Sequence, residues 1–306
     1  MAQFDDSTEE VLSTVFDSTP YLNSLAHIGE PYQLHTGGFR CLSRGIDGSL
    51  HRDALGPLPY SFQLGEQCPY LLREQLQKTG WVSFLGSFAP GIVPGDDWVK
   101  AGFEIVSYKS TYLFRPDRPR KELSTRSRRN LRRARKHWDV RRVNLKDCWR
   151  EVERIHTEML REKPVMEVSR RPASSFEVWA NLSAVETYAA YDEQGDGVWA
   201  IIACVNNELH LMALAAHERA YKTCGCYALY DFLTSDAGPW MPFHFGAVPA
   251  GQTGLARFKS RFSNAELPSY LTRIILRLDV ACELEVRLGT HQWFPAYRSP
   301  YQPSSL

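Results

Sequence analysis

The thirty residues Glu186–Ala215 read ETYAAYDEQGDGVWAIIACVNNELHLMALA. Here the spacing of apolar residues changes from a helical period to a period of two, which is typical of strands in a sheet. The alternation is broken at Gln194-Gly-Asp-Gly197 and at Asn206-Asn207, two sequences that suit tight turns. The stretch therefore predicts a meander of three strands, Glu186–Tyr191, Val198–Val205 and Glu208–Ala215.

Helices and further strands flank the meander on both sides. Before it, apolar residues recur at helical spacing over Leu145–Leu160 and Ser174–Leu182. After it we expect a helix from Thr223–Cys226, a strand at Trp240–Gly246, a short helix within Gly251–Phe262 and a strand near Ser269–Leu276. This order of elements predicts an α/β fold with a mixed sheet.

The first 110 residues have a less regular pattern. A capping box at Ser7, followed by apolar residues at helical spacing, predicts a helix, and Pro69–Lys78 has the pattern of a second. Extended segments are predicted at Tyr32–Arg44, Tyr60–Leu64, Trp81–Phe88 and, around a bend, Phe103–Phe114. Because single cores usually stop growing at about 250–300 residues, a chain of 306 residues is expected to form two lobes.

The composition is that of an ordinary globular protein. Hydrophobic residues make up 43% and charged residues 23% of the chain, which excludes disordered, collagen-like and coiled-coil proteins. The seven cysteines are scattered without a C-x-x-C pair, as expected for a reduced cytoplasmic protein without structural zinc. The acidic N-terminus lacks the pattern of a signal peptide, and no apolar run approaches the roughly 20 residues of a membrane helix. We expect a soluble, cytoplasmic protein.

The formal net charge of +1 hides an uneven distribution of charge. The window Lys109–Arg142 holds fourteen basic and three acidic residues, a net charge of +11, so the other 272 residues carry −10. This distribution predicts one basic element mounted on an acidic body.

The basic window contains a predicted helix, Ser124–Trp138, which has a capping residue, good helix formers and neither Gly nor Pro. Arg or Lys occupies nearly every position outside one stripe of small or apolar residues, Leu123, Ser127, Leu131, Ala134 and Trp138. Such a helix can dock by its stripe and leave a cationic face in solvent, where arginine suits two-point binding of phosphate. A merely solvated face is the alternative, but the density of positive charge favours a polyanionic partner.

Three motifs carry a family resemblance. Thr111-Tyr-Leu-Phe114 leads into LSTRSRRNLRRA at Leu123–Ala134, a strand followed by a basic R-x-N-x-x-x-A helix. AAHERAYKTCGCYALY spans the strand-to-helix junction Ala215–Tyr230, and Phe243-His-Phe-Gly246 is followed by GLARFKSRF at Gly254–Phe262. The last pair is similar to an F-x-F-G, G-L-x-x-F-K-x-x-F signature. With the order of elements, these motifs resemble the Fem-type branch of the GNAT acyltransferase fold.

The resemblance implies both an architecture and an activity. Fem-type enzymes transfer amino acids from aminoacyl-tRNA to an amine and have two GNAT-like lobes. We therefore expect an α/β fold of two such lobes, with mixed sheets flanked by helices, plus a basic helical arm. The lobes are expected at 1–110, on the acceptor side, and at 111–306, the acyltransferase lobe with basic helix 123–138. Aminoacyl-tRNA would be the co-substrate without a further cofactor, and the acceptor a peptide, cell-wall precursor or natural-product amine.

The resemblance also implies site residues. Phe258 and Lys259 would lie beside the aminoacyl end of the donor, with Lys259 facing its phosphate or the developing oxyanion, unless Lys259 is a surface residue. Lys222 and the amide of Gly225 would form an anion site at a helix start. Two arginines would extend the phosphate-binding surface or remain solvated, Arg257 and Arg261. The tRNA backbone would contact the basic helix through Arg126, Arg128, Arg129, Arg132, Arg133, Arg135 and Lys136.

A general base is less evident. His210 and His244 lie in predicted strands that splay around the acyl site in this fold, so each is a candidate base or a structural histidine. No metal-binding motif occurs, so we predict no metal. Cys224 and Cys226 at a helix start are better explained by close packing than by nucleophilic chemistry.

Two other functions stay open. GNAT enzymes that use acyl-CoA carry Q/R-x-x-G-x-G/A, whereas this chain has KTCGCY at Lys222–Tyr227, with a lysine first and a tyrosine where a small residue is needed. An acyl-CoA-dependent N-acyltransferase, with the basic helix at the 3′-phosphate of CoA, is the first alternative. A non-catalytic GNAT-like module that binds RNA is the second.

Overall fold

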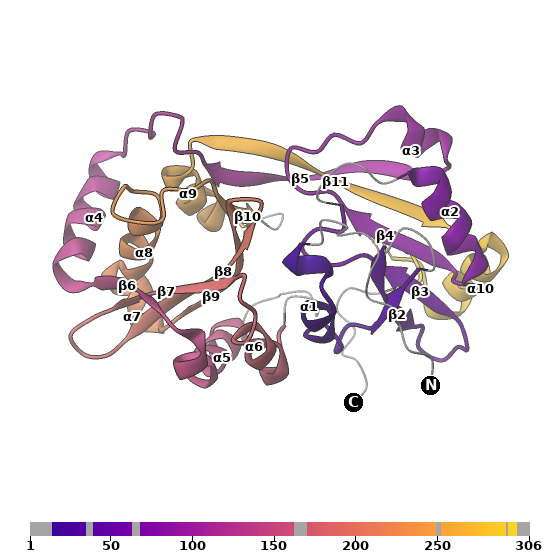
Figure 1. The fold of residues 1–306 in the computed structure, drawn as a ribbon, viewed down its shortest axis with the longest axis horizontal. Coiled ribbons are helices and arrows are strands. Elements are labelled where there is room, and N and C mark those ends of the chain that lie inside the picture. The colour runs from indigo at the N-terminus through magenta and orange to yellow at the C-terminus, as the bar shows by residue number, and fades with distance from the viewer. Residues whose placement is uncertain are drawn as a thin grey trace, which may run out of the picture.

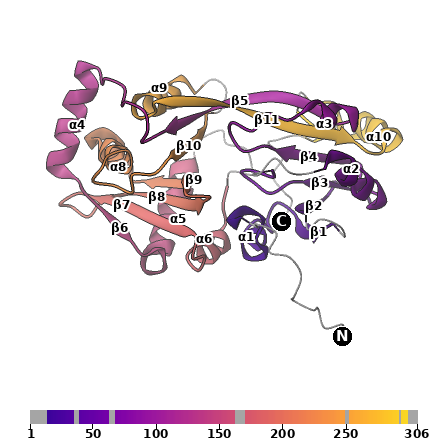
Figure 2. The ribbon, with the colours of Figure 1, turned by 45° about the horizontal axis from the view of Figure 1, so that its top comes forward.

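One mixed sheet of 11 strands, flanked by helices, runs the length of the molecule (Figure 1, Figure 2). The computed structural model describes residues 14–34, 39–62, 68–161, 170–248, 252–291 and 293–298. Within them the strand order is β1-β2-β3-β4-β11-β5-β10-β9-β8-β7-β6. The predicted α/β class with a mixed sheet is confirmed, while most of the helix predicted from Ser7 lies outside the described residues.

The C-terminal half of the sheet is the predicted meander. β7 (Val185–Tyr191), β8 (Gly197–Val205) and β9 (Glu208–Ala216) pair antiparallel. Alternate residues of β8 face two cores: Trp199 and Ile201 pack with α5 and α6, and Val198 and Ile202 pack with α8. These helices span Leu145–Arg161, Ala173–Trp179 and Gly225–Leu233. Helices on both faces explain why β8 is almost entirely buried.

The N-terminal half contains four short strands and an aromatic core. Its strands are β1 (Glu30–Gln33), β2 (Arg40–Gly45), β3 (Arg52–Leu55) and β4 (Ser83–Ser87). Its helices are α1 (Thr19–Asn23), α2 (Pro69–Lys78), α3 (Asp96–Lys100) and α10 (Leu278–Leu288). The rings of Phe62, Phe88 and Trp98 pack with centroids 4.9–5.0 Å apart. No described helix has the length and apolar content that crossing a membrane requires.

Two long strands join the halves. β5 (Glu104–Phe114) and β11 (Ala265–Ile275) pair antiparallel through nine residue pairs and form the bridge along the top of Figure 1. At one end β5 pairs with β10 (Phe243–Ala247), and at the other β11 pairs with β4. The strands expected around a bend at Phe103–Phe114 are therefore one strand, with an irregular register opposite Ser269 and Tyr270.

Segments from the two ends of the chain also contact the half to which they do not belong in sequence. In the N-terminal half α10 packs on Ile46 and Val82, although it follows the last strand of the chain. Conversely, Ser24, just after α1, accepts a hydrogen bond from the indole of Trp179 on α6 at 2.9 Å. The boundary expected at residue 110 falls inside β5. The two lobes thus form one continuous sheet, and each lobe contains packing contacts from a segment of the other half of the sequence.

Two elements differ from the expectations, whereas the basic helix does not. The basic helix is α4 (Thr125–His137), and its stripe packs along α8 (Figure 2). β6 (Asp139–Val143) was not expected, since it is an edge strand with exposed arginines rather than an alternating one. α10 was not expected either: Leu278 and Val286 are exposed, so its apolar residues form no single stripe.

A buried ion cluster fastens the C-terminal residues to the N-terminal half. Asp53 on β3 is fully buried and accepts hydrogen bonds from Nε of Arg44 at 2.9 Å and from Nη2 of Arg298 at 3.1 Å. The hydroxyl of Tyr297 lies 3.4 Å from the same carboxylate. A buried carboxylate with this many partners is costly to remove, because the largely buried guanidinium of Arg44 would lose its counter-ion.

We expect Asp53→Ala to lower the free energy of unfolding by about 3–5 kcal/mol, because it leaves the guanidinium of Arg44 buried and unpaired. Urea unfolding followed by circular dichroism measures this loss. Glu104→Ala is the control: it breaks the more exposed pair of Glu104 with Arg273 and should cost less than about 1 kcal/mol. Equal losses would show that the Asp53 cluster does not fasten the chain end.

Candidate functional site

The sheet opens where β9 meets β10. The two strands run parallel and pair only through Phe243 with Leu209 and His244 with His210. After His244 the register of β10 against β5 shifts, while β9 stays paired with β8 up to Ala216. The carboxyl end of β10 therefore leaves β9, and side chains from neighbouring elements can reach the gap.

Lys259 is fixed at the carboxyl end of β10. It lies on α9 (Thr253–Phe262), is only 6% exposed, and donates to the carbonyl oxygens of Gly246 at 3.1 Å and Ala247 at 3.0 Å. Gly246 has a φ of +73°, and a Cβ there would lie 3.8 Å from the ammonium. The left-handed conformation favours glycine at this position, whereas a contact of 3.8 Å would by itself tolerate a side chain. The alternative that Lys259 is a surface residue is therefore wrong.

The environment of Lys259 makes its proton labile. Burial, and secondarily the charge of Lys109, lowers the pKa of Lys259 to about 7. At neutral pH the amine thus exists both as a cationic donor and as a neutral acceptor. The neighbouring Phe258 packs in an aromatic cluster, with ring centroids 5.4 Å from Tyr227 and 4.9 Å from Tyr230.

The two predicted histidines form one cluster with a carboxylate. The rings of His210 and His244 stack with centroids 4.2 Å apart, and Nε2 of His244 lies 2.6 Å from Oε2 of Glu208. Both rings are buried, and in the described chain Nδ1 of each lacks a hydrogen-bond partner. Phe16 and Tyr60 from the N-terminal half cover His210, with centroids at 6.0 and 5.5 Å. The cluster therefore lies where the two halves meet.

The electrostatics of this cluster assign proton positions. Burial, followed by the charge of His244, lowers the pKa of His210 to about 2, so His210 is neutral. The hydrogen bond from His244 lowers the pKa of Glu208, which is ionised. In the neutral form of His244, a carboxylate that accepts the Nε2 proton leaves the lone pair on Nδ1. Glu208 was not predicted, but it lies two residues before His210 on β9, so the strand period places both on one face.

The same cluster has the composition of a metal site. Glu208, His210 and His244 each offer a ligand atom within 4.8 Å of the others. Imidazole lone pairs lie in the ring plane, and zinc–nitrogen bonds measure about 2.0–2.1 Å. Because the ring planes differ by only 10°, the two lone pairs do not converge on one ion. As placed, the cluster suits proton transfer better than metal binding.

Lys222 and Gly225, the predicted anion site, have other partners. Lys222, on α7 (Glu218–Thr223), pairs with Glu218 at 2.7 Å, and both side chains are exposed. Gly225 begins α8 beneath Trp138, whose ring lies 2.9 Å from where a Cβ would stand. The indole nitrogen of Trp138 donates to the carbonyl of Thr223 at 3.1 Å. Close packing of the indole therefore explains the glycine.

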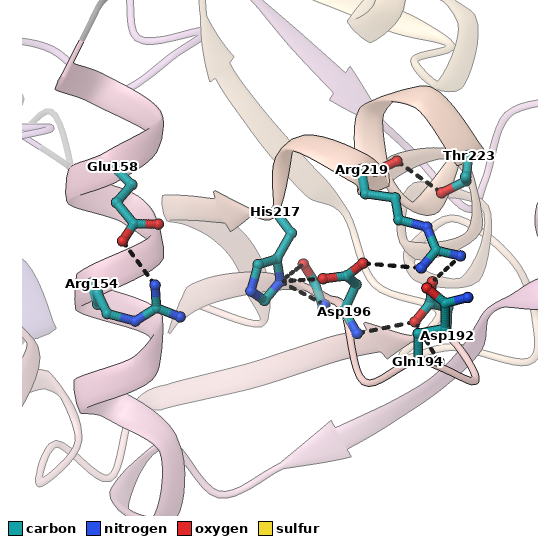
Figure 3. Close-up of polar contacts among 9 residues, drawn as sticks. Arg154, Glu158, Asp192, Gln194, Asp196, His217, Arg219 and Thr223 are labelled. Carbon is teal, nitrogen blue, oxygen red and sulfur yellow. Dashed lines mark hydrogen bonds and ion pairs between the residues drawn. The ribbon is translucent and has the colours of Figure 1, made fainter.

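An ion-pair network fixes the corner between β9 and α7 (Figure 3). Arg219 lies 3.4 Å from the carboxylates of both Asp192 and Asp196, which belong to the turn between β7 and β8. Next to the network is a cavity of about 160 Å³ at the end of α4. Its lining includes Arg133, His137, Trp138, Asp192, Glu193 and Arg219.

The basic helix α4 docks as its stripe predicts. Ser124 caps it by accepting the amide of Ser127 at 3.2 Å, and Ser127, Leu131 and Ala134 are buried. Two of the seven predicted tRNA contacts are engaged within the protein. Arg135 binds Asp231 on α8 at 2.8 Å, and Arg128 binds Glu122 at 2.8 Å.

Five basic residues of α4 remain exposed and make no ion pair within the described chain. They are Arg126, Arg129, Arg132, Arg133 and Lys136. Because each helical residue is turned by about 100° from the last, the five fall within an arc of roughly 120°. That arc lies opposite the buried stripe. α4 thus presents one continuous cationic face to solvent.

Solved structures match this fold, although no protein-family model and no curated protein matches the sequence. FemX is 12% identical, with a TM-score of 0.64 over 89% of this chain and 94% of that chain. The C-terminal domain of a protein assigned as a lysylphosphatidylglycerol synthetase, from Agrobacterium fabrum, is 13% identical, with a TM-score of 0.58 over 90% and 91%. L-PGS from Bacillus licheniformis is 14% identical, with a TM-score of 0.57 over 88% and 90%. The Fem-type resemblance of the three motifs is therefore confirmed at the level of the fold.

The buried ammonium predicts a pH dependence of stability. Because the folded-state pKa of Lys259 is about 7 and its ordinary value is 10.5, the unfolded chain binds more protons between these values. Stability should therefore rise with pH from about 7 toward 10 by up to about 1.4 kcal/mol per unit from this group. In Lys259→Met that contribution should vanish, as measured by urea unfolding at pH 6, 7, 8 and 9. An unchanged slope, or the same change in the exposed-site control Lys100→Met, would contradict the assignment.

Proposed function

We propose that this protein transfers an aminoacyl group from aminoacyl-tRNA to an amine acceptor and forms an amide bond. The fold shared with FemX supports a transferase. The observation that carries the choice of donor is the cationic face of α4, on a chain whose remainder is acidic. Such a face suits a polyanion, because each phosphate contact releases counterions. The acceptor would be a peptide, a cell-wall precursor or a natural-product amine.

The proposed reaction is an exchange of an ester for an amide. The neutral acceptor amine attacks the carbonyl carbon of the aminoacyl ester. A C–N bond forms, the C–O bond to the terminal ribose breaks, and the proton lost by the amine ends on the ribose oxygen. Positioning of the two substrates supplies much of the acceleration. The remaining needs are a proton acceptor and a donor to the oxyanion of the tetrahedral intermediate.

Two buried side chains beside β10 are the candidates for these roles: Lys259 at its carboxyl end, and His244 where it pairs with β9. Two N–H bonds of protonated Lys259 are directed to Gly246 and Ala247. The third has no acceptor among the described residues, and we assign it to the oxyanion or a phosphate. His244, whose Nε2 proton is held by Glu208, is the candidate base through Nδ1.

The acyl-CoA alternative has less support. The CoA pyrophosphate would bind backbone amides at the start of α8. Trp138 covers Gly225 at this point, and Lys222 is paired with Glu218. A module that only binds RNA has no need of a buried lysine with a pKa near 7, a feature that is typical of functional sites.

The donor can be tested directly by incubating the protein with mixed charged tRNAs and candidate amines. We expect aminoacyl-tRNA to be consumed with an amide product in the mass spectrum, and acetyl-CoA to remain. Lys259→Met should lower kcat at least tenfold, because the oxyanion loses a donor. Consumption of acetyl-CoA alone would assign the alternative enzyme. RNA binding without turnover, equal in Lys259→Met, would assign the RNA-binding module.

The cationic face can be tested by charge reversal. Arg129→Glu with Arg132→Glu should weaken tRNA binding at least tenfold and lower the slope of log K against log salt by about 0.7–0.9 per lost phosphate contact. Filter binding at several salt concentrations measures both quantities. Lys100→Glu with Arg287→Glu makes the same charge change at exposed positions of the N-terminal half. If this control weakens binding equally, the attraction is general and α4 is not the docking surface.

A further inference from the structure

A second cavity lies at the opposite end of α4 from the one beside the ion-pair network. It has a volume of about 290 Å³ and is bounded by the chain entering α4 and by α9. Its lining comprises Lys121, Glu122, Leu123, Ser124, Ser127, Arg257, Ser260 and Arg261. The cavity thus brings two predicted phosphate-binding arginines together with residues 121–127, which no motif had connected with them.

The charged groups around this cavity are largely available to a ligand. Within the described residues Lys121 and Arg257 make no ion pair, and Arg261 donates to the hydroxyl of Tyr227 at 2.6 Å. The one carboxylate, Glu122, is bound to Arg128 at 2.8 Å. Three cations therefore surround the space, and the one carboxylate on its border already has a partner.

Comparison of the two cavities of α4 shows which suits an anion. The cavity at its C-terminal end combines two arginines with two carboxylates, so its formal charges cancel. The cavity at its N-terminal end has three cations and one carboxylate, a net charge of +2. It also has nearly twice the volume, 290 against 160 Å³. A phosphate group gains most from the second, where arginine can bind it at two points.

The helix α9 relates this cavity to the opening in the sheet. Arg257 and Arg261 are four residues apart, share one side of α9 and line the cavity. Lys259, between them in sequence, points to the other side, where its ammonium contacts the end of β10. A helix with its side chains is about 10–12 Å wide. The cavity and the buried ammonium therefore lie on opposite sides of one helix, within the span of a short single-stranded segment.

We propose that this cavity binds a phosphate group of the acyl donor, while the acyl end passes over α9 toward Lys259. The proposal rests on the proposed function for the identity of the donor. The shared chemistry is a phosphate ester, supplied either by the backbone of the tRNA 3′ end or by CoA. The cationic face of α4 lies on the side of the helix opposite the cavity-lining Ser127. RNA is the favoured source, because its backbone carries enough phosphates to occupy both the face and the cavity.

The test is a set of binding measurements with the whole protein and three probes. The first probe is a short single-stranded RNA whose 3′ end is CCA, the second is CoA and the third is inorganic phosphate. Binding of each probe is measured by isothermal titration calorimetry. Lys121→Gln with Arg257→Gln removes two cations that make no ion pair in the described chain, so folding should be kept. We expect at least a tenfold loss of affinity for RNA. The matched control, Lys100→Gln with Arg287→Gln, should change it less than twofold.

A second variant and the separate probes make the result decisive. Ser260→Glu, as a separate variant, places a carboxylate at the cavity and should also weaken RNA binding. The hydroxyl of Ser260 donates to the carbonyl of Arg257 within α9, so its loss should not disturb the fold. Loss confined to RNA assigns an RNA phosphate, and loss confined to CoA assigns a CoA phosphate to the same cavity. Affinities for all probes within twofold of the unaltered protein in both variants would overturn the proposal.

Binding and turnover separate this proposal from the proposed function. If RNA affinity falls in the variants but no charged tRNA is consumed by the unaltered protein, the cavity assignment stands and the transferase assignment fails. If charged tRNA is consumed and the variants bind it normally, the transferase stands and the cavity assignment fails.

Discussion

The antiparallel pairing of β5 with β11 is the constraint on which the rest of the structure depends. Each strand has eleven residues and satisfies its partner's backbone groups along most of that length. Their other edges pair with β10 and β4, which belong to different halves. Inside the pair, the hydroxyls of Thr111 and Ser269 lie 2.9 Å apart and are buried. The bridge turns two small sheets into one and leaves neither half with an open edge at the junction.

The bridge also positions the elements of the candidate site. β10 pairs with one edge of β5 and with β9 on its other side. Because β10 pairs with β9 through only two residue pairs, the two strands separate beyond His244. The chain that leaves β10 returns as α9 and brings Lys259 back to the carbonyl groups of β10. The chain that leaves β5 becomes α4 and docks on α8. The buried lysine, the histidine cluster and the cationic face thus come from elements held by the same pair of strands.

The basic side chains of this protein fall into three groups, which differ in what each side chain contacts. Arg135 on α4 binds Asp231 and fastens the helix to the body. The five exposed cations of α4 face solvent. Three further cations surround the cavity between α4 and α9: Lys121, Arg257 and Arg261. Lys259 is withdrawn from water and has its pKa lowered to about 7. In the sequence these residues appear only as one basic window and one motif. Their pKa values and their availability to a ligand differ, because their burial and their ion pairs differ.

Local patterns in the sequence determined the elements that decide the fold. The alternation in 186–215 predicted the meander, the stripe in 124–138 predicted which side of α4 docks, and three motifs predicted the Fem-type fold. The meander and the docking stripe follow from periodicity, which is encoded within a few turns or strand residues. The Fem-type fold was implied only by the resemblance of the motifs. Only the tertiary structure decided that the two lobes share a sheet, that Trp138 covers Gly225 and that Glu208 holds His244. These depend on contacts between residues 36 to more than 80 positions apart, whose geometry no local pattern contains.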